Sequence, residues 1–306
     1  MHDHRKKKSA LVSICCCTYN HENYIAQCLD SFLMQETNFE CEILVHDDAS
    51  TDGTSDIVRE YEKKHPNLFR NVYQEENQFL IQNTLTNVLF PMAKGKYIAL
   101  CEGDDYWTDP NKLQKQVDFL EANEELSMCF TNGVTITENS LTLDPIISND
   151  YHPNKFDTKY LISKDCRIPT ASVVFRKNLL DIDLNDFPMG DYPLYYFLSK
   201  KGLIGYLSES SVAYRIHQTS FLRSHSIKQL KRNQILCIQK ILERDKSELK
   251  TLRYNMSVHY DELAGLEIRD KNFIQFFKIL YKTLISYPYR NLRQWRDTIY
   301  RLRKYE

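Results

Sequence analysis

Apolar runs and amphipathic segments alternate along the first third of the chain. Short apolar runs predict buried strands at residues 11–16, 42–46, 71–74 and 97–101. Apolar side chains at helical spacing predict helices at residues 24–34, 55–64 and 80–93. Strands that alternate with helices at about 30 residues per unit indicate βαβ units and a parallel sheet. The pattern therefore predicts an α/β fold with a Rossmann-type, mostly parallel sheet flanked by helices.

The pattern becomes less regular after the fourth strand. Further helices are predicted at 113–122 and 191–201, and further strands at 126–131, 171–175, 203–207 and 212–216. The segment 133–165 is polar, contains two prolines and is predicted to be rich in loops. From residue 226 onward only helical patterns remain. We therefore predict a flexible basic arm over 1–8, an α/β domain over 9–225 and a helical extension over 226–306.

Polar residues follow three of the predicted strands directly. Thr18, Tyr19 and Asn20 follow the first, Asp47-Asp48 follows the second, and the segment 102–105, Glu-Gly-Asp-Asp, follows the fourth. Ligands of open α/β sheets bind at the carboxyl ends of the strands. The three clusters are therefore expected to converge on one site.

The acidic clusters suggest a metal and a nucleotide. Burying unpaired carboxylates such as Asp104 and Asp105 is costly, whereas carboxylate oxygens suit Mg²⁺ or Mn²⁺ bound together with substrate phosphates. A nucleoside diphosphate leaving group requires such charge neutralisation. Asp48 could accept the N–H of a pyrimidine ring. The alternative for these carboxylates is a solvated turn that caps a helix.

Composition and missing motifs exclude several other classes. With 42% hydrophobic and 26% charged residues, the chain has an ordinary globular composition, and its net charge of −1 gives no argument for a nucleic-acid partner. The turn after the first strand, CTYNHEN, has no glycine, so the dinucleotide-binding fingerprint is absent, as is a P-loop. The nine cysteines form no CxxC pair and are expected to be buried thiols in a reducing compartment.

Three segments together resemble the family 2 glycosyltransferases with the GT-A fold. They read VSICCCTYNHENYIAQCLDSFLMQ, EILVHDDASTDGT and KGKYIALCEGDDYWTDPNKLQKQVDFL, and they cover roughly residues 10–130. The resemblance implies inverting, metal-assisted transfer of a sugar, of the hexosyl or N-acetylhexosaminyl type, from a nucleotide-diphosphate sugar. It suggests a UDP-sugar as donor, Mn²⁺ or Mg²⁺ as cofactor and a hydroxyl of a glycan or lipid-linked acceptor. It also suggests a bacterial enzyme of polysaccharide biosynthesis.

The resemblance implies a role for each motif residue. Thr18 and Tyr19 match the first nucleotide-contacting turn, and Asp48 matches the acidic residue that binds the base. Asp104 would face ribose or metal, and Asp105 would be the direct metal ligand. The family's motif often begins with Asp where this chain has Glu102, so no role is assigned to Glu102.

Four later residues each have a functional and a structural interpretation. Asp191 matches the family's general base, which would take the proton from the acceptor hydroxyl, or it caps a helix. His217 would bind metal or diphosphate, or it is structural. Arg215 would pair with the diphosphate, or with a core carboxylate. Trp107 would form a platform for the acceptor sugar, or it packs in the core.

The family match at Asp191 is incomplete, because Gly190 stands where the family often has a first acidic residue. This leaves an alternative function open, a non-catalytic protein that binds nucleotide-sugars on the same fold.

The tail 271–306 has its own pattern. It carries nine Lys or Arg and two acidic residues, a net charge of +7, interleaved with aromatic side chains. Such a segment can lie on an anionic membrane surface, or it can pack as a helical bundle with a solvated basic face. The chain shows no signal peptide and no apolar stretch of membrane-spanning length. We therefore expect a cytoplasmic protein, either free or peripheral on the inner face of the membrane.

Overall fold

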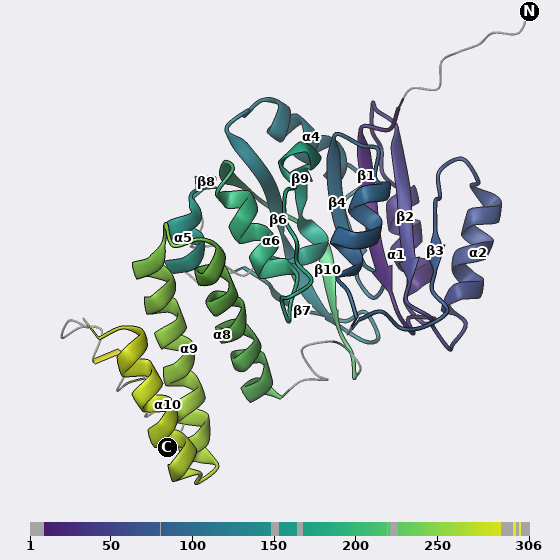
Figure 1. Ribbon diagram of the computed structural model, residues 1–306. Helices are drawn as coiled ribbons and strands as arrows, with labels where there is room; N and C mark the ends of the chain where they lie inside the picture. The colour runs from purple at the N-terminus through teal and green to yellow at the C-terminus, as the bar shows by residue number, and fades with distance from the viewer. Residues whose placement is uncertain are drawn as a thin grey trace, which may run out of the picture. The chain divides into compact units, whose positions relative to one another are not determined.

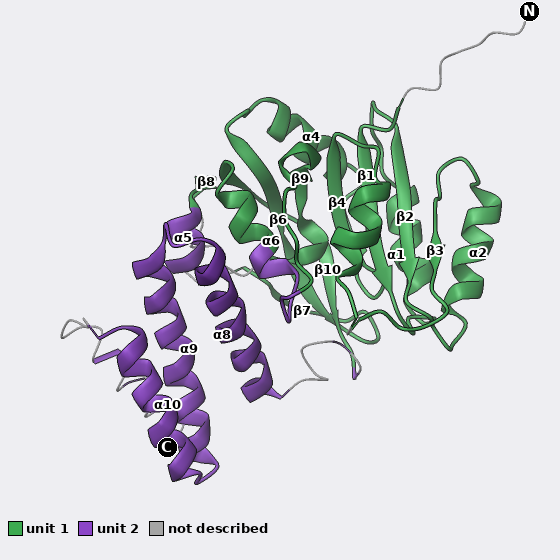
Figure 2. Ribbon diagram, in the orientation of Figure 1, with its two compact units in different colours: residues 1–157, 167–185, 194–217 green, residues 158–166, 186–193, 218–306 purple. Residues whose placement is uncertain are grey.

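The computed structural model divides the chain into two compact units. Unit 1 comprises 1–157, 167–185 and 194–217, and unit 2 comprises 158–166, 186–193 and 218–306 (Figure 2). The structure describes residues 9–79, 81–147, 153–163, 168–218, 220, 226–288, 296–297 and 300. The predicted arm over 1–8 and the predicted boundary near 225 lie outside the described residues. Two short segments that the sequence assigned to the α/β domain, 158–166 and 186–193, belong to unit 2.

Unit 1 is built on one mixed sheet whose strands follow the order β3-β2-β1-β4-β9-β6-β10-β5 (Figure 1). The first four strands are parallel: β1 (Val12–Thr18), β2 (Cys41–Asp47), β3 (Val72–Tyr73) and β4 (Tyr97–Glu102). The central strands β1, β2 and β4 are almost entirely buried, as their continuous apolar runs require. The predicted mostly parallel α/β sheet is confirmed.

Amphipathic helices cover this sheet. They are α1 (Ile25–Leu33), α2 (Thr54–Lys64) and α4 (Lys112–Glu121). Their apolar stripes, for example Ile25, Leu29 and Phe32 on α1, enter the same hydrophobic core as the strands. Burial of these faces stabilises the unit because apolar surface leaves water.

The second half of the sheet is more irregular than the sequence predicts. It contains β5 (Tyr106–Trp107), β6 (Leu126–Thr137), β9 (Val174–Arg176) and β10 (Leu203–Ile216). The predicted strands 203–207 and 212–216 are one strand, β10, whose register against β6 shifts between Leu207 and Val212. The predicted loop-rich segment 133–165 also contains regular elements: β7 (Thr142–Pro145), β8 (Lys155–Phe156) and α5 (Thr158–Ser163).

Prolines account for two further differences. The predicted helix 80–93 is a π-helical turn, Leu85–Leu89, followed by the short α3 (Phe90–Met92). Pro91 has no N–H, so it cannot donate a helical hydrogen bond to the turn before it. The predicted strand 171–175 begins only at Val174, because a 3₁₀ turn, Thr170–Ser172, follows Pro169. The hydroxyl of Ser172 donates to the carbonyl of Pro169 and stabilises this turn.

Unit 2 is helical, which confirms the predicted C-terminal helices. It contains α5, the first residues of α6 (Asp191–Ser199), α8 (Ile227–Arg244), α9 (Leu249–Arg269) and α10 (Phe273–Ser286). Ion pairs join α8 to α9, among them Lys228–Glu267 at 2.8 Å and Lys231–Glu262 at 2.6 Å. Within the described residues, no helix combines the length and the apolar character that crossing a bilayer requires.

Candidate functional site

The carboxyl ends of β1, β2 and β4 meet, as the sequence predicts. Thr18 pairs in register with Asp47, and the amide of Asp48 donates to the carbonyl of Thr18 over 3.0 Å. On the other side of β1, the amide of Gly103 donates to the carbonyl of Cys17 over 2.9 Å. A Cβ at Gly103 would lie 2.6 Å from Thr18 Oγ1, so only glycine permits this close approach.

The two aspartates that follow β2 have different surroundings. Asp47 accepts hydrogen bonds from the hydroxyls of Ser50 and Ser55, so its carboxylate stabilises the turn. Asp48 is 8% exposed, and its Oδ1 accepts the amide of Gln78 over 2.7 Å. Ala49, the next residue, has φ 61°, a strained conformation of the kind that clusters at functional sites. This geometry singles out Asp48, not Asp47, as the candidate ligand-binding carboxylate.

The first turn supplies an exposed aromatic side chain. Tyr19, which follows the buried Thr18, is 44% exposed. Asn20 has φ 56°, and its side-chain oxygen accepts the amide of Thr51 in the turn after β2. The turns after β1 and β2 are therefore tied together, with Tyr19 at the surface beside them.

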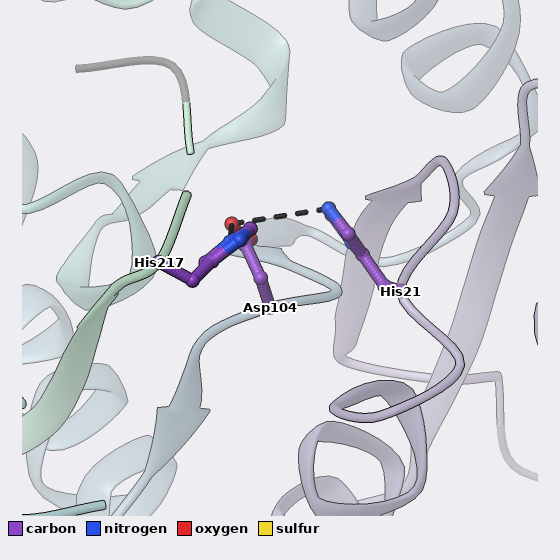
Figure 3. Close-up of side chains that lie close together, drawn as sticks. All are labelled: His21, Asp104 and His217. Carbon is purple, nitrogen blue, oxygen red and sulfur yellow. Dashed lines mark hydrogen bonds and ion pairs between the residues drawn. The ribbon is translucent and has the colours of Figure 1, made fainter. Parts of the chain in front are cut away.

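A cluster of two histidines and one aspartate lies at the end of β4 (Figure 3). We call His21, Asp104 and His217 the His–Asp cluster. His217 Nε2 lies 3.0 Å and His21 Nε2 lies 3.8 Å from Asp104 Oδ2. One potential ligand atom from each residue lies within 4.8 Å of the other two. The cluster therefore joins the turn after β1, the turn after β4 and the residue after β10.

The cluster's charges stabilise one another. Burial raises the pKa of Asp104, but the hydrogen bond from His217 and the charges of both histidines outweigh burial and lower this pKa below its ordinary value. Burial lowers the pKa of His21 more than the Asp104 charge raises it, which favours the neutral imidazole that can bind a metal. Thr18 Oγ1 lies 3.3 Å from His21 Nδ1 and orients the ring.

Asp105, the neighbour of Asp104, points into a different environment. Asp105 is 2% exposed, and its Oδ1 accepts the backbone amide of Arg215 over 2.8 Å. Burial and the charges of Asp104 and Glu102 raise the pKa of Asp105 well above its ordinary value. One carboxyl oxygen of Asp105 is therefore engaged by the backbone, and Asp105 is not among the three residues whose ligand atoms converge. Asp104, and not Asp105, belongs to the His–Asp cluster, and the assignment of Asp105 as the direct metal ligand stays a prediction.

Arg215 is also buried, and its guanidinium binds the protein itself. Its Nε donates to the carbonyl of Asp104 over 3.0 Å, and Nη2 donates to Gln27 Oε1 over 2.7 Å. Nη1 donates to the carbonyl of Glu138 and to Ser140 Oγ. The guanidinium's hydrogen bonds go to carbonyls, Gln27 and Ser140 and not to a core carboxylate, which corrects that interpretation, and pairing with a diphosphate stays a prediction. Arg215 instead holds the turn that carries Asp104.

Trp107 lies in the hydrophobic core. The side chain is 1% exposed, packs against Phe32 at 4.7 Å between ring centroids, and donates its indole N–H to the carbonyl of Ala171 over 2.8 Å. The ammonium of Lys112 lies 4.2 Å from the centre of its ring. The hypothesis that Trp107 forms an acceptor platform is corrected, because a buried indole cannot stack on a sugar.

Asp191 belongs to unit 2. It is the first residue of α6, and its Oδ1 accepts the amide of Tyr192 over 2.7 Å. Burial raises its pKa above the ordinary value for aspartate. A raised pKa suits proton transfer, while the hydrogen bond is a local contact at the helix start. Both interpretations of Asp191 therefore stay open.

His21 is a residue of the cluster that the sequence did not single out. The residue lies in the segment CTYNHEN, three positions after Thr18, where the strand-end argument already predicted ligands. One sequence signal could have identified it: His21 follows the first predicted strand, just as aspartates follow the second and the fourth, and imidazole and carboxylate side chains can bind a metal together. The long separation between His21 and His217 along the chain hid their pairing.

The donor set of the His–Asp cluster fits a divalent metal. Two imidazole nitrogens and a carboxylate oxygen converge within 4.8 Å of one another. Imidazole nitrogens and carboxylate oxygens are both common ligands of divalent metals in proteins. The residues therefore fit a divalent metal, as the sequence predicts.

Comparison with known proteins supports the fold and the motifs. The model of the family described as "Glycosyl transferase family 2" matches residues 13–182. An uncharacterized protein of Mycobacterium tuberculosis is 38% identical over 212 residues, which cover 67% of this chain and 59% of that protein. The chain thus spans less than two thirds of this relative's length. A protein of Escherichia coli named as the UDP-Glc:α-D-GlcNAc-diphosphoundecaprenol β-1,3-glucosyltransferase WfgD is 31% identical over 72% of this chain and 83% of its own.

Solved structures share the fold at low sequence identity. Residues 1–349 of S. aureus TarS in complex with UDP-GlcNAc match with a TM-score of 0.57 and 17% identity, over 91% of this chain and 93% of that one. The mannosyltransferase PcManGT from Pyrobaculum calidifontis, solved with GDP-Man and Mn²⁺, matches with a TM-score of 0.55 and 15% identity, over 92% and 88%. At these identities the likeness establishes the GT-A architecture.

Proposed function

This chain belongs to glycosyl transferase family 2, and we propose that it transfers a sugar from a nucleotide-diphosphate sugar to a hydroxyl acceptor with inversion. The observation that carries the proposal is the His–Asp cluster at the strand ends, beside Asp48 and Tyr19. This edge of the sheet is where open α/β folds bind their ligands.

The nucleotide is assigned to the turns after β1 and β2. Asp48 accepts the N–H of a pyrimidine ring through its carboxylate, and Tyr19 lies against the base. Solved relatives in complex with UDP-GlcNAc or GDP-Man support a nucleotide-sugar as donor. The carboxylate of Asp48 suits a base with a ring N–H, such as the N3–H of uracil, and the UDP-GlcNAc complex of TarS supports a UDP-sugar as the donor.

The His–Asp cluster holds the divalent metal in this proposal. When bound, the ion neutralises the charge that develops on the diphosphate as it leaves. His21, Asp104 and His217 would fix its position, and Mn²⁺ is the ion proposed because the structure of PcManGT, which shares the fold, was solved with it. Arg215 keeps the Asp104 turn in place from behind.

Asp191 is proposed as the general base. It takes the proton of the acceptor hydroxyl as that oxygen bonds to the anomeric carbon and the bond from this carbon to the diphosphate breaks. A single in-line displacement inverts the anomeric centre. The raised pKa of Asp191 predicts that activity falls, on acidification, at a higher pH than the ordinary aspartate value.

The name of the E. coli relative suggests an acceptor sugar linked to a lipid diphosphate.

Thermal unfolding in the presence of donors tests the proposal. The purified chain is melted with UDP-, GDP- and dTDP-sugars, each with and without Mn²⁺. A ligand that binds only the native state raises its stability by RT ln(1 + [L]/Kd), so about 100-fold excess over Kd adds about 2.7 kcal/mol. We expect a Mn²⁺-dependent rise with UDP-sugars. If no nucleotide-sugar stabilises the chain with Mn²⁺ present, the proposal is wrong.

Asp191→Asn separates catalysis from binding. We expect it to leave the donor-induced thermal shift intact and to lower sugar transfer or donor hydrolysis by about 100- to 10,000-fold, the usual contribution of a general base. Unchanged turnover in Asp191→Asn contradicts the base assignment. A wild-type chain that binds donor but neither transfers nor hydrolyses it supports the alternative, a non-catalytic nucleotide-sugar-binding protein.

A further inference from the structure

Helix α10 exposes an apolar stripe. We call the following residues the α10 stripe: Phe273, Ile274, Phe277, Tyr281, Leu284 and Ile285, which are between 37% and 71% exposed. At 100° per residue these positions fall within an arc of about 120° on one side of the helix. Scattered exposed apolar residues are ordinary, whereas a contiguous exposed patch marks an interaction site.

The other side of α10 is already occupied. Ile279 and Thr283 are buried, and α10 packs along α9. Asn272 caps the helix by accepting the amide of Gln275. The helix is thus anchored in unit 2 by one face, and the α10 stripe is a second, separate surface.

Positive charge borders the stripe. Lys278 and Lys282 are exposed and follow the stripe on its polar side, at helical angles just beyond Ile285. The sequence from 271 to 288 contains no Asp or Glu, and the tail 271–306 carries a net charge of +7. An apolar stripe flanked by lysines, with an aromatic hydroxyl at Tyr281, is the pattern of helices that lie in a membrane interface.

We propose that α10 binds the surface of an anionic membrane, with the α10 stripe buried at the boundary of headgroups and acyl chains. The six apolar side chains leave water for the acyl region. Lys278 and Lys282 stay at the level of the phosphates, where each lysine contributes about 1 kcal/mol, or about fivefold in affinity. Tyr281 places its ring in the interface and its hydroxyl towards water.

A second copy of the chain fits this surface less well. A stable protein interface takes about 20–30 residues from each side, whereas the α10 stripe offers six. Two α10 helices face to face would also bring their lysines together, because no acidic residue between 271 and 288 compensates them. Charge complementarity therefore favours anionic lipid. The inference does not depend on the proposed sugar transfer.

Vesicle sedimentation with the full chain tests the inference. The chain is mixed with vesicles of phosphatidylcholine alone or with vesicles that also contain about 30 mol% phosphatidylglycerol. The anionic lipid gives the second kind of vesicle a negative surface potential. We expect the chain to sediment with the anionic vesicles and not with the neutral ones, and binding to weaken as salt is raised, because salt screens the lysines.

Three variants identify the surface. Phe273→Gln, Phe277→Gln and Ile285→Gln are combined to remove the apolar contact, and we expect at least a tenfold loss of binding. Lys278→Gln with Lys282→Gln should weaken binding by about 25-fold, two lysines at fivefold each. Leu141→Gln with Leu143→Gln is the β7 control: it changes an exposed leucine just before β7 and another within it, and it should leave vesicle binding unchanged.

Folding and self-association are measured on the same samples. Thermal melts establish that each variant is folded, and sedimentation velocity gives its oligomeric state. Failure to bind anionic vesicles, or equal loss in the β7 control, overturns the inference. A wild-type dimer that the triple glutamine variant turns into a monomer, with vesicle binding unchanged, also overturns it and assigns the stripe to a second copy.

Discussion

Asp104 and Asp105 are neighbours in the sequence, yet they belong to two different regions of the molecule. Asp104 faces two histidines at the strand ends, where its pKa is held below the ordinary value. Asp105 turns inward to the backbone of Arg215, where burial raises its pKa. The same side chain is therefore a candidate metal ligand in one region and a structural acceptor in the other. Surroundings decide this difference, since the residue type is identical.

The two regions also differ in the partners of their nitrogen-containing side chains. The histidines of the His–Asp cluster have ring nitrogens that converge on one carboxylate oxygen and can bind an ion. The guanidinium of Arg215 donates its hydrogen bonds to backbone carbonyls, Gln27 and Ser140. The His–Asp cluster can bind a metal ion, whereas Arg215 belongs to a hydrogen-bond network within the protein. Substitutions in the cluster should therefore change mainly metal binding and turnover, and substitution of Arg215 should change mainly the free energy of unfolding.

The largest expected effect is at Asp104. Asp104→Asn removes the charge that the two histidines share, so we expect Mn²⁺-dependent donor turnover to fall about 1,000-fold, as the loss of several kcal/mol of transition-state stabilisation predicts. Turnover assays and the Mn²⁺-dependent thermal shift measure this. Stability at neutral pH without metal should also fall, because a carboxylate whose pKa is lowered in the folded chain stabilises that chain. Retained Mn²⁺ dependence in Asp104→Asn contradicts the assignment of the cluster.

Arg215 should act mainly on stability. Arg215→Met leaves several buried acceptors unpaired, and we expect the free energy of unfolding to fall by about 3 kcal/mol. Urea denaturation measures the loss. Mn²⁺ affinity should also fall, because the turn that carries Asp104 loses its support.

Arg176→Met is the matched control for Arg215. Arg176 donates to the carbonyls of Leu126 and Leu120 at the other end of the sheet. Its replacement should lower stability without weakening Mn²⁺ affinity relative to the native chain. Equal loss of Mn²⁺ affinity in both variants contradicts a specific role of Arg215 at the site.

His21 tests whether the cluster has three members. His21→Ala should weaken Mn²⁺ affinity by about 10- to 100-fold, the scale of changes that disturb a metal's immediate surroundings. Titration of Mn²⁺ against thermal stability measures the shift. His65→Ala, on the exposed end of α2, is the control and should have no effect. An unchanged affinity in His21→Ala leaves only Asp104 and His217 in the cluster.

The smallest expected effect is at Asp105. Asp105→Asn keeps the oxygen that accepts the amide of Arg215 and nearly the same volume, so we expect stability to change by less than about 1 kcal/mol. Donor binding with Mn²⁺ should persist. Urea denaturation and the donor-induced shift measure both. If Asp105→Asn loses the Mn²⁺-dependent donor shift while Asp104→Asn stays active, Asp105 and not Asp104 is the metal ligand.

Much of the fold is predictable because its signals are local. The buried runs of β1, β2 and β4 and the helical stripes of α1, α2 and α4 are periodic patterns that one stretch of chain carries by itself. Errors arose where long-range pairing overrides local pattern, as in the single strand β10. They also arose at Pro91 and Pro169, whose effects on backbone hydrogen bonding were underestimated.

The sequence by itself determined that polar residues end three parallel strands, and that Thr18, Asp48 and Asp104 therefore come together. It did not determine which carboxylate turns outward, because burial depends on what packs behind each side chain. Only the tertiary structure brought His21 to His217, buried Trp107 and closed Arg215 in its own network. Those outcomes depend on contacts between residues far apart in the chain, which set the desolvation and the partners that no local pattern contains.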